Sequence, residues 1–192
     1  LGLNNNDSIV VNGAVILNMN GGGGFDGTQI NVGGNPANLT LNVNGNLNVG
    51  GNNTRIVANV SAANIYGGQA TNARFTGQLN ITGQLGLGNG TQITGTVFAG
   101  SVAASSASNV VFNGNVTTTG QLSLGNNSQV MGQVTVGSLS SGTGNTITGN
   151  IQSGGTVTIG ASSVVHGSIN ANVININNNA IINGPLTSVG DT

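Results

Sequence analysis

One short phrase recurs along most of this chain: an apolar residue, any residue, glycine, any residue and a second apolar residue. One copy runs from Ile93 through Gly95 to Val97, and another runs from Val165 through Gly167 to Ile169. Repetition at a fixed period is the signature of a solenoid, so this feature limits the possible folds more than any other. The central glycines follow one another at a nearly constant interval. They are Gly77, Gly95, Gly114, Gly132, Gly149, Gly167 and Gly184.

Apolar and polar residues alternate within each unit, as they do at Leu79, Ile81, Leu85 and Leu87. A period of two predicts strands, and glycine and asparagine at regular intervals supply corners where φ is positive. We therefore expect an all-β fold, a triangular single-stranded parallel β-helix with about 18 residues per coil and roughly nine to ten coils. Asparagines that recur at equivalent points are expected to form side-chain ladders along the axis. Examples are Asn113, Asn115, Asn150 and Asn183.

The repeat divides the chain unevenly. Residues 37–192 carry the regular phrase, whereas residues 1–36 contain a glycine run at positions 21–24 that breaks its phase. We expect the first segment to form one or two irregular coils, or an arm that bridges to another molecule. Proline cannot donate to a hydrogen-bond ladder, and the two prolines, Pro36 and Pro185, lie near the two ends of the chain, as a continuous solenoid requires.

Composition narrows the function. Charged residues make up 3% of the chain and the net charge is -1, so no basic surface exists to neutralise the phosphates of a nucleic acid. No apolar run approaches the ~20 residues of a membrane span, which argues against membrane insertion. With 0 cysteines, no thiolate metal site can form. A surface rich in Asn, Thr and Gly and poor in charge is typical of secreted bacterial proteins, so we expect an extracellular or cell-surface location.

Few side chains offer chemistry. His166 is the single histidine, and catalysis needs a second positioned group, so we interpret it as an ordinary surface residue. Asp26 follows a glycine run that resembles one calcium-binding repeat, but no second copy supplies further ligands. Arg55 and Arg74 fall in successive coils of the repeat and could stack one above the other, where they would repel unless they pointed to different faces, so they are interpreted as solvated. Glu is absent and the three Asp residues are scattered, with Asp7 and Asp191 near opposite ends of the sequence, so we expect no pair of carboxylates that could hydrolyse a polysaccharide. We expect no enzyme activity, no cofactor and no metal.

Two resemblances follow from the repeat. The segment from Ile93 to Gly100 resembles the repeats of bactofilins, and the similarity covers roughly residues 39–187. It implies a polymer-forming protein whose triangular, right-handed β-helices join end to end into non-polar filaments. The segment from Gly45 to Gly51 is similar to filamentous-haemagglutinin-type repeats, which implies a secreted adhesin.

The ends of the chain point to assembly. A β-helix exposes unpaired strand edges and an open core at each end, and neither end here carries an amphipathic helix or gatekeeping charges. We therefore expect a homopolymer that stacks head to tail in an extracellular filament or surface fibre. The alternatives are the stalk of an adhesin, an ice-binding solenoid and a cytoskeletal bactofilin, and cell-surface polysaccharide is a further candidate partner. The expected assembly interface consists of Leu3, Val10, Val11, Val15, Ile181, Ile182 and Leu186.

Overall fold

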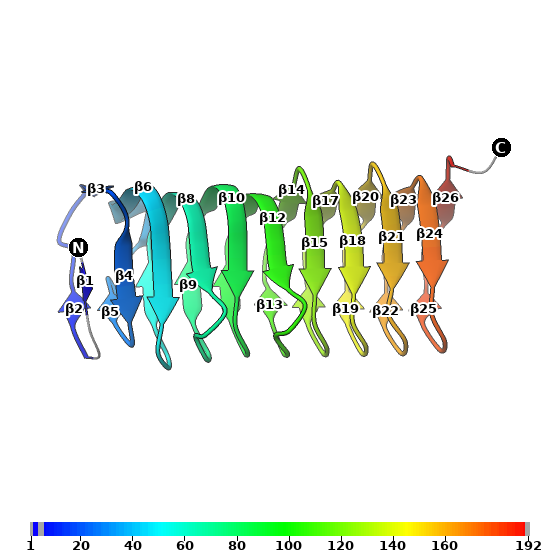
Figure 1. Ribbon diagram of the computed structural model, residues 1–192, viewed down its shortest axis with the longest axis horizontal. Helices are drawn as coiled ribbons and strands as arrows, with labels where there is room; N and C mark the ends of the chain where they lie inside the picture. The colour runs from blue at the N-terminus through cyan, green and yellow to red at the C-terminus, as the bar shows by residue number, and fades with distance from the viewer. Residues whose placement is uncertain (1, 4–5, 191–192) are drawn as a thin grey trace.

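The structure, a computed structural model, describes residues 2–3 and 6–190. They wind into a solenoid in which each strand pairs in parallel with the equivalent strand of the next coil (Figure 1). One sheet contains ten strands, one for each of ten coils, which confirms the predicted all-β parallel solenoid and its coil length. The one helical segment among the described residues is a 3₁₀ turn, η1 (Pro36–Asn38), where Oδ1 of Asn35 accepts a hydrogen bond from the backbone N–H of Ala37.

The strands of each coil fall on three faces, and the four long strands bend so that each contributes to two of them. Face 1 is β2 (Ser8–Ile9), β5 (Gln29–Ile30), β7 (Arg55–Val57), β9 (Arg74–Thr76), β11 (Gln92–Thr94), β13 (Val111–Phe112), β16 (Gln129–Val130), β19 (Thr146–Ile147), β22 (Val164–Val165) and β25 (Ile181–Ile182). Face 2 is β3 (Val15–Asn20), the first parts of β6 (Leu39–Gly50), β8 (Asn59–Gly67), β10 (Leu79–Leu87) and β12 (Val97–Ala104), then β14 (Val116–Thr118), β17 (Val134–Val136), β20 (Ile151–Ser153), β23 (Ile169–Ala171) and β26 (Leu186–Ser188). Face 3 is β1 (Gly2–Leu3), β4 (Gly23–Asp26), the second parts of β6, β8, β10 and β12, then β15 (Gln121–Leu124), β18 (Ser138–Ser141), β21 (Thr156–Ile159) and β24 (Val173–Ile176).

The alternation seen in the sequence directs the aliphatic side chains into one continuous core. In β10, Leu79, Ile81 and Leu85 are buried, while Asn80 and Gln84 between them face solvent. Because successive side chains of a strand point to opposite faces of the sheet, each coil adds one layer of aliphatic side chains to the interior. A layer is sealed only by the layers above and below it, so the fold depends on stacking.

A left-handed residue marks the corner before face 1 in every coil. The φ angles of these ten corner residues lie between 54° and 70°, a conformation that glycine and asparagine tolerate better than other residues. Asparagine takes the position in six coils, glycine in three and serine in one. These residues are Asn6, Gly27, Asn53, Asn72, Gly90, Asn109, Asn127, Gly144, Ser162 and Asn179.

The seven repeated glycines have a different role from the one the sequence predicted for glycine. Only Gly77 and Gly95 have a positive φ, at 127° and 137°. Each later glycine of the series lies directly against the backbone of the previous one, so that a Cβ at Gly132 would collide with the carbonyl group of Gly114. The regular spacing therefore records a column of close backbone contacts between coils rather than a column of left-handed turns.

Asparagine side chains link successive coils, but mainly through the backbone. Oδ1 of Asn115 accepts a hydrogen bond of 2.9 Å from the backbone N–H of Gln133 in the next coil. Oδ1 of Asn150 accepts one of 3.0 Å from Ser168 in the same way. At these positions the expected ladder of side chains is replaced by a bond from each asparagine to the coil that follows, which fixes the register of the stack.

A buried polar column runs along the inside of the corner next to the left-handed residues. The backbone N–H of Asn145 donates to Oγ of Ser163 over 3.0 Å, and the N–H of Ser128 donates to Oδ1 of Asn145 over 2.6 Å. Ser128 in turn accepts a hydrogen bond of 3.3 Å from the backbone N–H of Val110. Buried polar groups are costly unless they are paired, so this column favours one stacking register over its neighbours.

The N-terminal segment also winds into coils. The strands β1, β2 and β3 pair in parallel with β4, β5 and β6, respectively. The left-handed corners of this part are Asn6, Gly27 and Asn53, and each interval between them is longer than any that follows, so the first coils are the longest. A division of the chain near residues 36 and 37 stays a prediction.

Candidate assembly interface at the two ends

Both ends of the solenoid present strands that are paired on one side only. At the N-terminal end, β1, β2 and β3 pair only with the following coil, and at the C-terminal end β24, β25 and β26 pair only with the preceding one. No helix covers either end within residues 2–3 and 6–190 (Figure 1). An uncovered sheet edge offers a row of backbone donors and acceptors to another chain.

The core is open at the C-terminal end. Leu186 is the partner of Ile169 in the preceding coil, yet 48% of Leu186 is exposed and Ile169 is fully buried. Ile176 is 43% exposed, whereas its partner Ile159 is fully buried. Ile174 is half-buried at the same end. These side chains point towards the interior and are exposed because no further coil covers them.

The N-terminal end shows the same pattern. Val15 is 42% exposed, whereas its partner in the next coil, Leu39, is buried. Ile9 is half-buried and its partner Ile30 is fully buried. The first coil is therefore open on its outer side in the same way as the last.

The seven side chains expected at the interface all belong to the first or last coil. Three of them, Leu3, Val11 and Ile182, are half-buried and pack against the core. The other four are more exposed: Val10 (73%), Val15 (42%), Ile181 (54%) and Leu186 (48%). Further apolar side chains of these two coils were not predicted from the sequence, because their place relative to the open ends depends on the exact register. They are Ile16, Leu17, Ile174, Ile176 and Val189.

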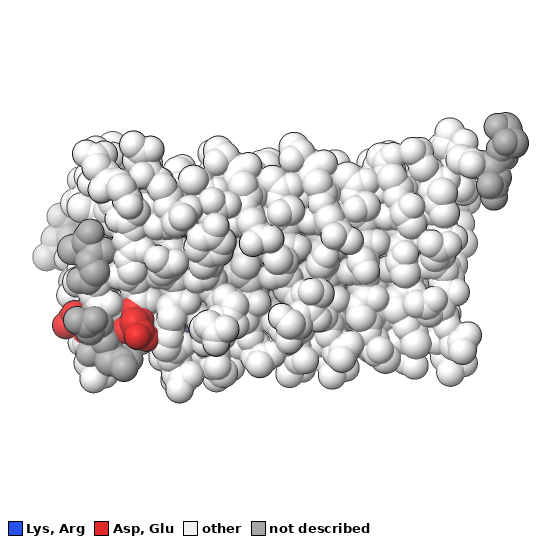
Figure 2. All heavy atoms as spheres, in the orientation of Figure 1, with Lys and Arg blue, Asp and Glu red and all other residues white. Residues whose placement is uncertain are grey.

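The two ends differ in charge. Asp7 and Asp26 are exposed and lie in the first two coils, and Figure 2 shows acidic atoms only at that end of the visible face. Residues 173–190, which form the last coil, contain no charged side chain, and Asp191 lies outside the described residues. No group of three His, Cys, Asp or Glu side chains suited to a metal ion occurs among the described residues, and the glycine run before Asp26 partly forms β4.

The single histidine lies on face 1, far from both aspartates along the chain. The side-chain nitrogen of Asn183 is 3.0 Å from Nδ1 of His166, and both residues are exposed. His166 thus belongs to an outward row of exposed residues on successive coils, and its exposure agrees with the surface position expected from the sequence. An amide neighbour cannot exchange protons with an imidazole near neutral pH, so this contact offers no acid–base pair.

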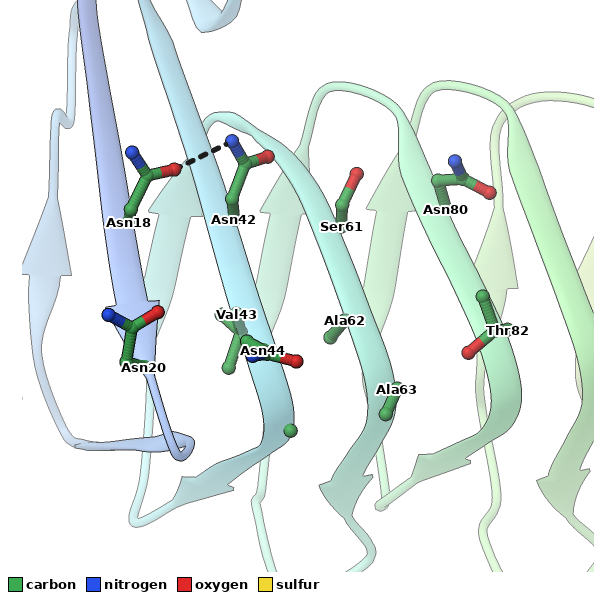
Figure 3. A pocket seen from close by; sticks show the side chains of 11 residues that line it. Asn18, Asn20, Asn42, Val43, Asn44, Ser61, Ala62, Ala63, Asn80 and Thr82 are labelled. Carbon is green, nitrogen blue, oxygen red and sulfur yellow. Dashed lines mark hydrogen bonds between the residues drawn. The ribbon is translucent and has the colours of Figure 1, made fainter.

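A shallow hollow of about 570 Å³ lies on face 2 across β3, β6, β8 and β10. Figure 3 shows two rows of side chains along it, with small residues of β8 between the longer ones of β6 and β10. Nδ2 of Asn42 donates to Oδ1 of Asn18 over 2.9 Å, a true asparagine-to-asparagine contact between coils. Amide and hydroxyl groups line the hollow together with alanine, valine and glycine, and no lining residue titrates.

Comparison with known proteins identifies the family of this chain. The family model of the bactofilins, described as polymer-forming cytoskeletal, matches residues 87–187, which is 101 of the 192 residues. The chain belongs to the bactofilin family. No curated protein and no solved structure matches it. The match lies within the segment that the sequence analysis identified as bactofilin-like, and it makes this chain a polymer-forming structural protein.

The family match also corrects one expectation. The low charge of the surface predicted an extracellular or cell-surface location, and this prediction is wrong, because the family is cytoskeletal. Exposed amides and hydroxyls hydrate a surface without charge, so a scarcity of charged residues does not identify a secreted protein. A cytoskeletal bactofilin therefore agrees with the family match better than an extracellular fibre or an adhesin stalk does. The described residues contain no helix long and apolar enough to cross a membrane.

Proposed function

We propose that this bactofilin is a structural subunit that polymerises with itself by stacking the open ends of its solenoid. The observation that carries the proposal is the exposure of inward-facing core residues in the last coil. Leu186 and Ile176 are 48% and 43% exposed at positions whose partners in the preceding coil are fully buried. A second subunit at this end would act on them as the next coil does elsewhere.

Burial of the end layers favours such stacking. Complete burial of one aliphatic side chain contributes ~1.5–3 kcal/mol, and each open end carries several partly exposed ones. Ile174, Ile182 and Leu186 form such a set at the C-terminal end, and Leu3, Ile9 and Leu17 form one at the N-terminal end. The association is therefore driven by the same layers that hold the coils of one chain together.

Backbone pairing between the terminal strands of two subunits would add to this association. The free edges of the terminal strands carry N–H and C=O groups that water satisfies in a lone subunit and that a neighbouring strand satisfies in a polymer. Head-to-tail stacking would prolong the parallel pairing found throughout the chain, because the first coil of one subunit would follow the last coil of another. This head-to-tail order stays a prediction. The resemblance to bactofilins implies non-polar filaments instead, in which like ends of the solenoid meet, and an image of the filament at subunit resolution would separate the two orders.

The test introduces a charge at one end and an equal charge on a side. In Leu186→Lys the ammonium group would have to be buried in the stacked end, so we expect filaments to be lost while far-UV circular dichroism is unchanged. Met131→Lys is the matched control, because Met131 is 51% exposed and directly follows β16 of face 1, away from both ends. Negative-stain electron microscopy and sedimentation report the filaments.

Val15→Lys applies the same test to the other end, where the side chain is 42% exposed at a position whose partner, Leu39, is buried. Loss of filaments in both end variants but not in Met131→Lys would support stacking through the two ends. Filaments of normal length and yield from the folded Leu186→Lys and Val15→Lys proteins would overturn the proposal.

A further inference from the structure

The chain has two cationic side chains, Arg55 and Arg74, and they are direct neighbours on face 1. They stand opposite each other in the pairing of β7 with β9, and both are exposed. Adjacent strands lie ~4.8 Å apart, so the two side chains leave the sheet side by side. From the sequence the two arginines could stack or could point to different faces, and the pairing of β7 with β9 shows that they stack.

This placement is unfavourable without an anion. Like charges directly opposite each other on neighbouring strands destabilise a sheet. The flanking members of the same outward row are the neutral residues Gln29 and Gln92. Neither guanidinium has a hydrogen bond or an ion pair with any other described residue. The two positive charges therefore face solvent with no carboxylate of the described chain to balance them.

We infer that Arg55 and Arg74 together form a binding site for one phosphate group. A guanidinium presents a planar fork of N–H donors that matches phosphate oxygens, and two adjacent forks can hold different oxygens of one group. A phosphate monoester carries about -1.5 to -2 charges near neutral pH, which balances two guanidinium groups. A carboxylate carries one charge and is already satisfied by a single arginine, so it fits the pair less well.

The fold holds this pair in place. Ile56 and Phe75, the residues that follow the two arginines, are buried in the core, with exposures of 1% and 2%. Their packing fixes the backbone of β7 and β9 and hence the separation of the two Cα atoms. Because the pair lies in the third and fourth coils of face 1, bound phosphate would leave both ends free, and the inference does not depend on the proposed polymerisation.

The site would take a single phosphate group rather than a polyanion. Arg55 and Arg74 are the whole supply of cations in the chain, and a nucleic acid requires many phosphate contacts for tight binding. A free phosphate compound and a lipid with a phosphate monoester headgroup both offer the required chemistry. These two sources can be separated by experiment.

The experiment compares thermal unfolding in phosphate and in chloride at equal pH and ionic strength. The informative variant is Arg74→Gln/Gln129→Arg, which keeps two arginines and the net charge but moves one of them three coils along the same row. We expect phosphate to raise the midpoint temperature of the wild type and not that of this variant. In dilute chloride the variant should unfold at a higher temperature than the wild type, because the repulsion is relieved.

A second arm identifies the source of the phosphate. Flotation with phosphatidylcholine vesicles, with and without phosphatidic acid, separates vesicle-bound protein from filaments, which do not float. Flotation that requires phosphatidic acid and both arginines supports a lipid headgroup, and phosphate-dependent stabilisation without flotation supports a soluble phosphate compound. Equal effects of phosphate on the wild type and on Arg74→Gln/Gln129→Arg, with no arginine-dependent flotation, would overturn the inference.

Discussion

Side chains at equivalent positions are buried in the interior coils of this solenoid and exposed in its terminal coils. Ile169 in the ninth coil is fully buried, and its partner Leu186 in the last coil is 48% exposed. Leu39 is buried near the start of the chain, and its outer neighbour Val15 is 42% exposed. Burial is therefore provided by the neighbouring coil and not by the coil to which the side chain belongs. In each terminal coil this neighbour is missing on one side, so core residues at both ends of the solenoid are partly exposed.

The largest loss of unfolding free energy is expected when the buried member of one such pair is truncated, and the loss should be smaller for its exposed partner. Ile169→Ala removes a fully buried side chain, and substitutions of this kind cost ~2–5 kcal/mol of unfolding free energy. Leu186→Ala should cost less than half as much in the free subunit, because its side chain is already half exposed. Chemical unfolding at low protein concentration measures both values.

The same pair should respond differently to assembly. If subunits stack by their ends, the effect of Leu186→Ala should grow towards that of Ile169→Ala as the protein concentration is raised into the filament range. A difference between the two variants that is independent of concentration would contradict burial of Leu186 in the polymer.

A smaller effect is expected from the glycine column of the interior. A Cβ at Gly132 would collide with the backbone of Gly114, so we expect Gly132→Ala to lower stability by ~1–3 kcal/mol. Gly154→Ala is the control, since no atom lies within 4 Å of the position of its Cβ. Urea unfolding should separate the two variants, and equal midpoints would show that the coils can move apart without cost.

The smallest effect concerns the left-handed corners. Asn127 has a φ of 54°, a conformation that costs most residues ~1–2 kcal/mol and asparagine and glycine less. Asn127→Ala should therefore be less stable than Asn127→Gly in thermal unfolding. Asn80→Ala, an exposed substitution in β10 outside any corner, should stay close to the wild type. A loss in Asn80→Ala equal to that in Asn127→Ala would show that the corner conformation is not responsible.

The sequence predicted the coil, the three strands in each coil and the family, because a fixed period and a two-residue alternation are local patterns. It could not predict why the glycines recur, since close packing of Gly132 on Gly114 becomes visible only when the coils are in register. Glycine and asparagine were expected at corners with a positive φ, but the sequence could not show which of them take this conformation, because asparagine is common throughout the chain. Arg55 and Arg74 could be counted but not assigned to one row until β7 was paired with β9.

The candidate interface was predicted in part for a similar reason. Leu186 and Val15 were identified because they lie near the ends of the chain, whereas Ile176, which is almost as near to an end as Val15, could be placed in the last coil only through its pairing with Ile159. Distance from a terminus is a poor measure of distance from an end of a solenoid, since every residue of a whole coil occupies the same layer. The predicted location was wrong because composition determines how a surface is hydrated and does not determine where the protein resides.

The regular recurrence of the left-handed corner also means that one coil can be gained or lost as a whole segment of sequence. From Asn53 onwards it recurs at a nearly constant interval and is followed by the same sequence of strands, so a segment from one corner to the next contains one complete layer. Duplication or loss of such a segment would change the length of the subunit by one layer and leave both terminal surfaces as they were. Relatives with different numbers of coils could then share one mode of joining, and subunit length could evolve in steps without any change in the contacts between subunits.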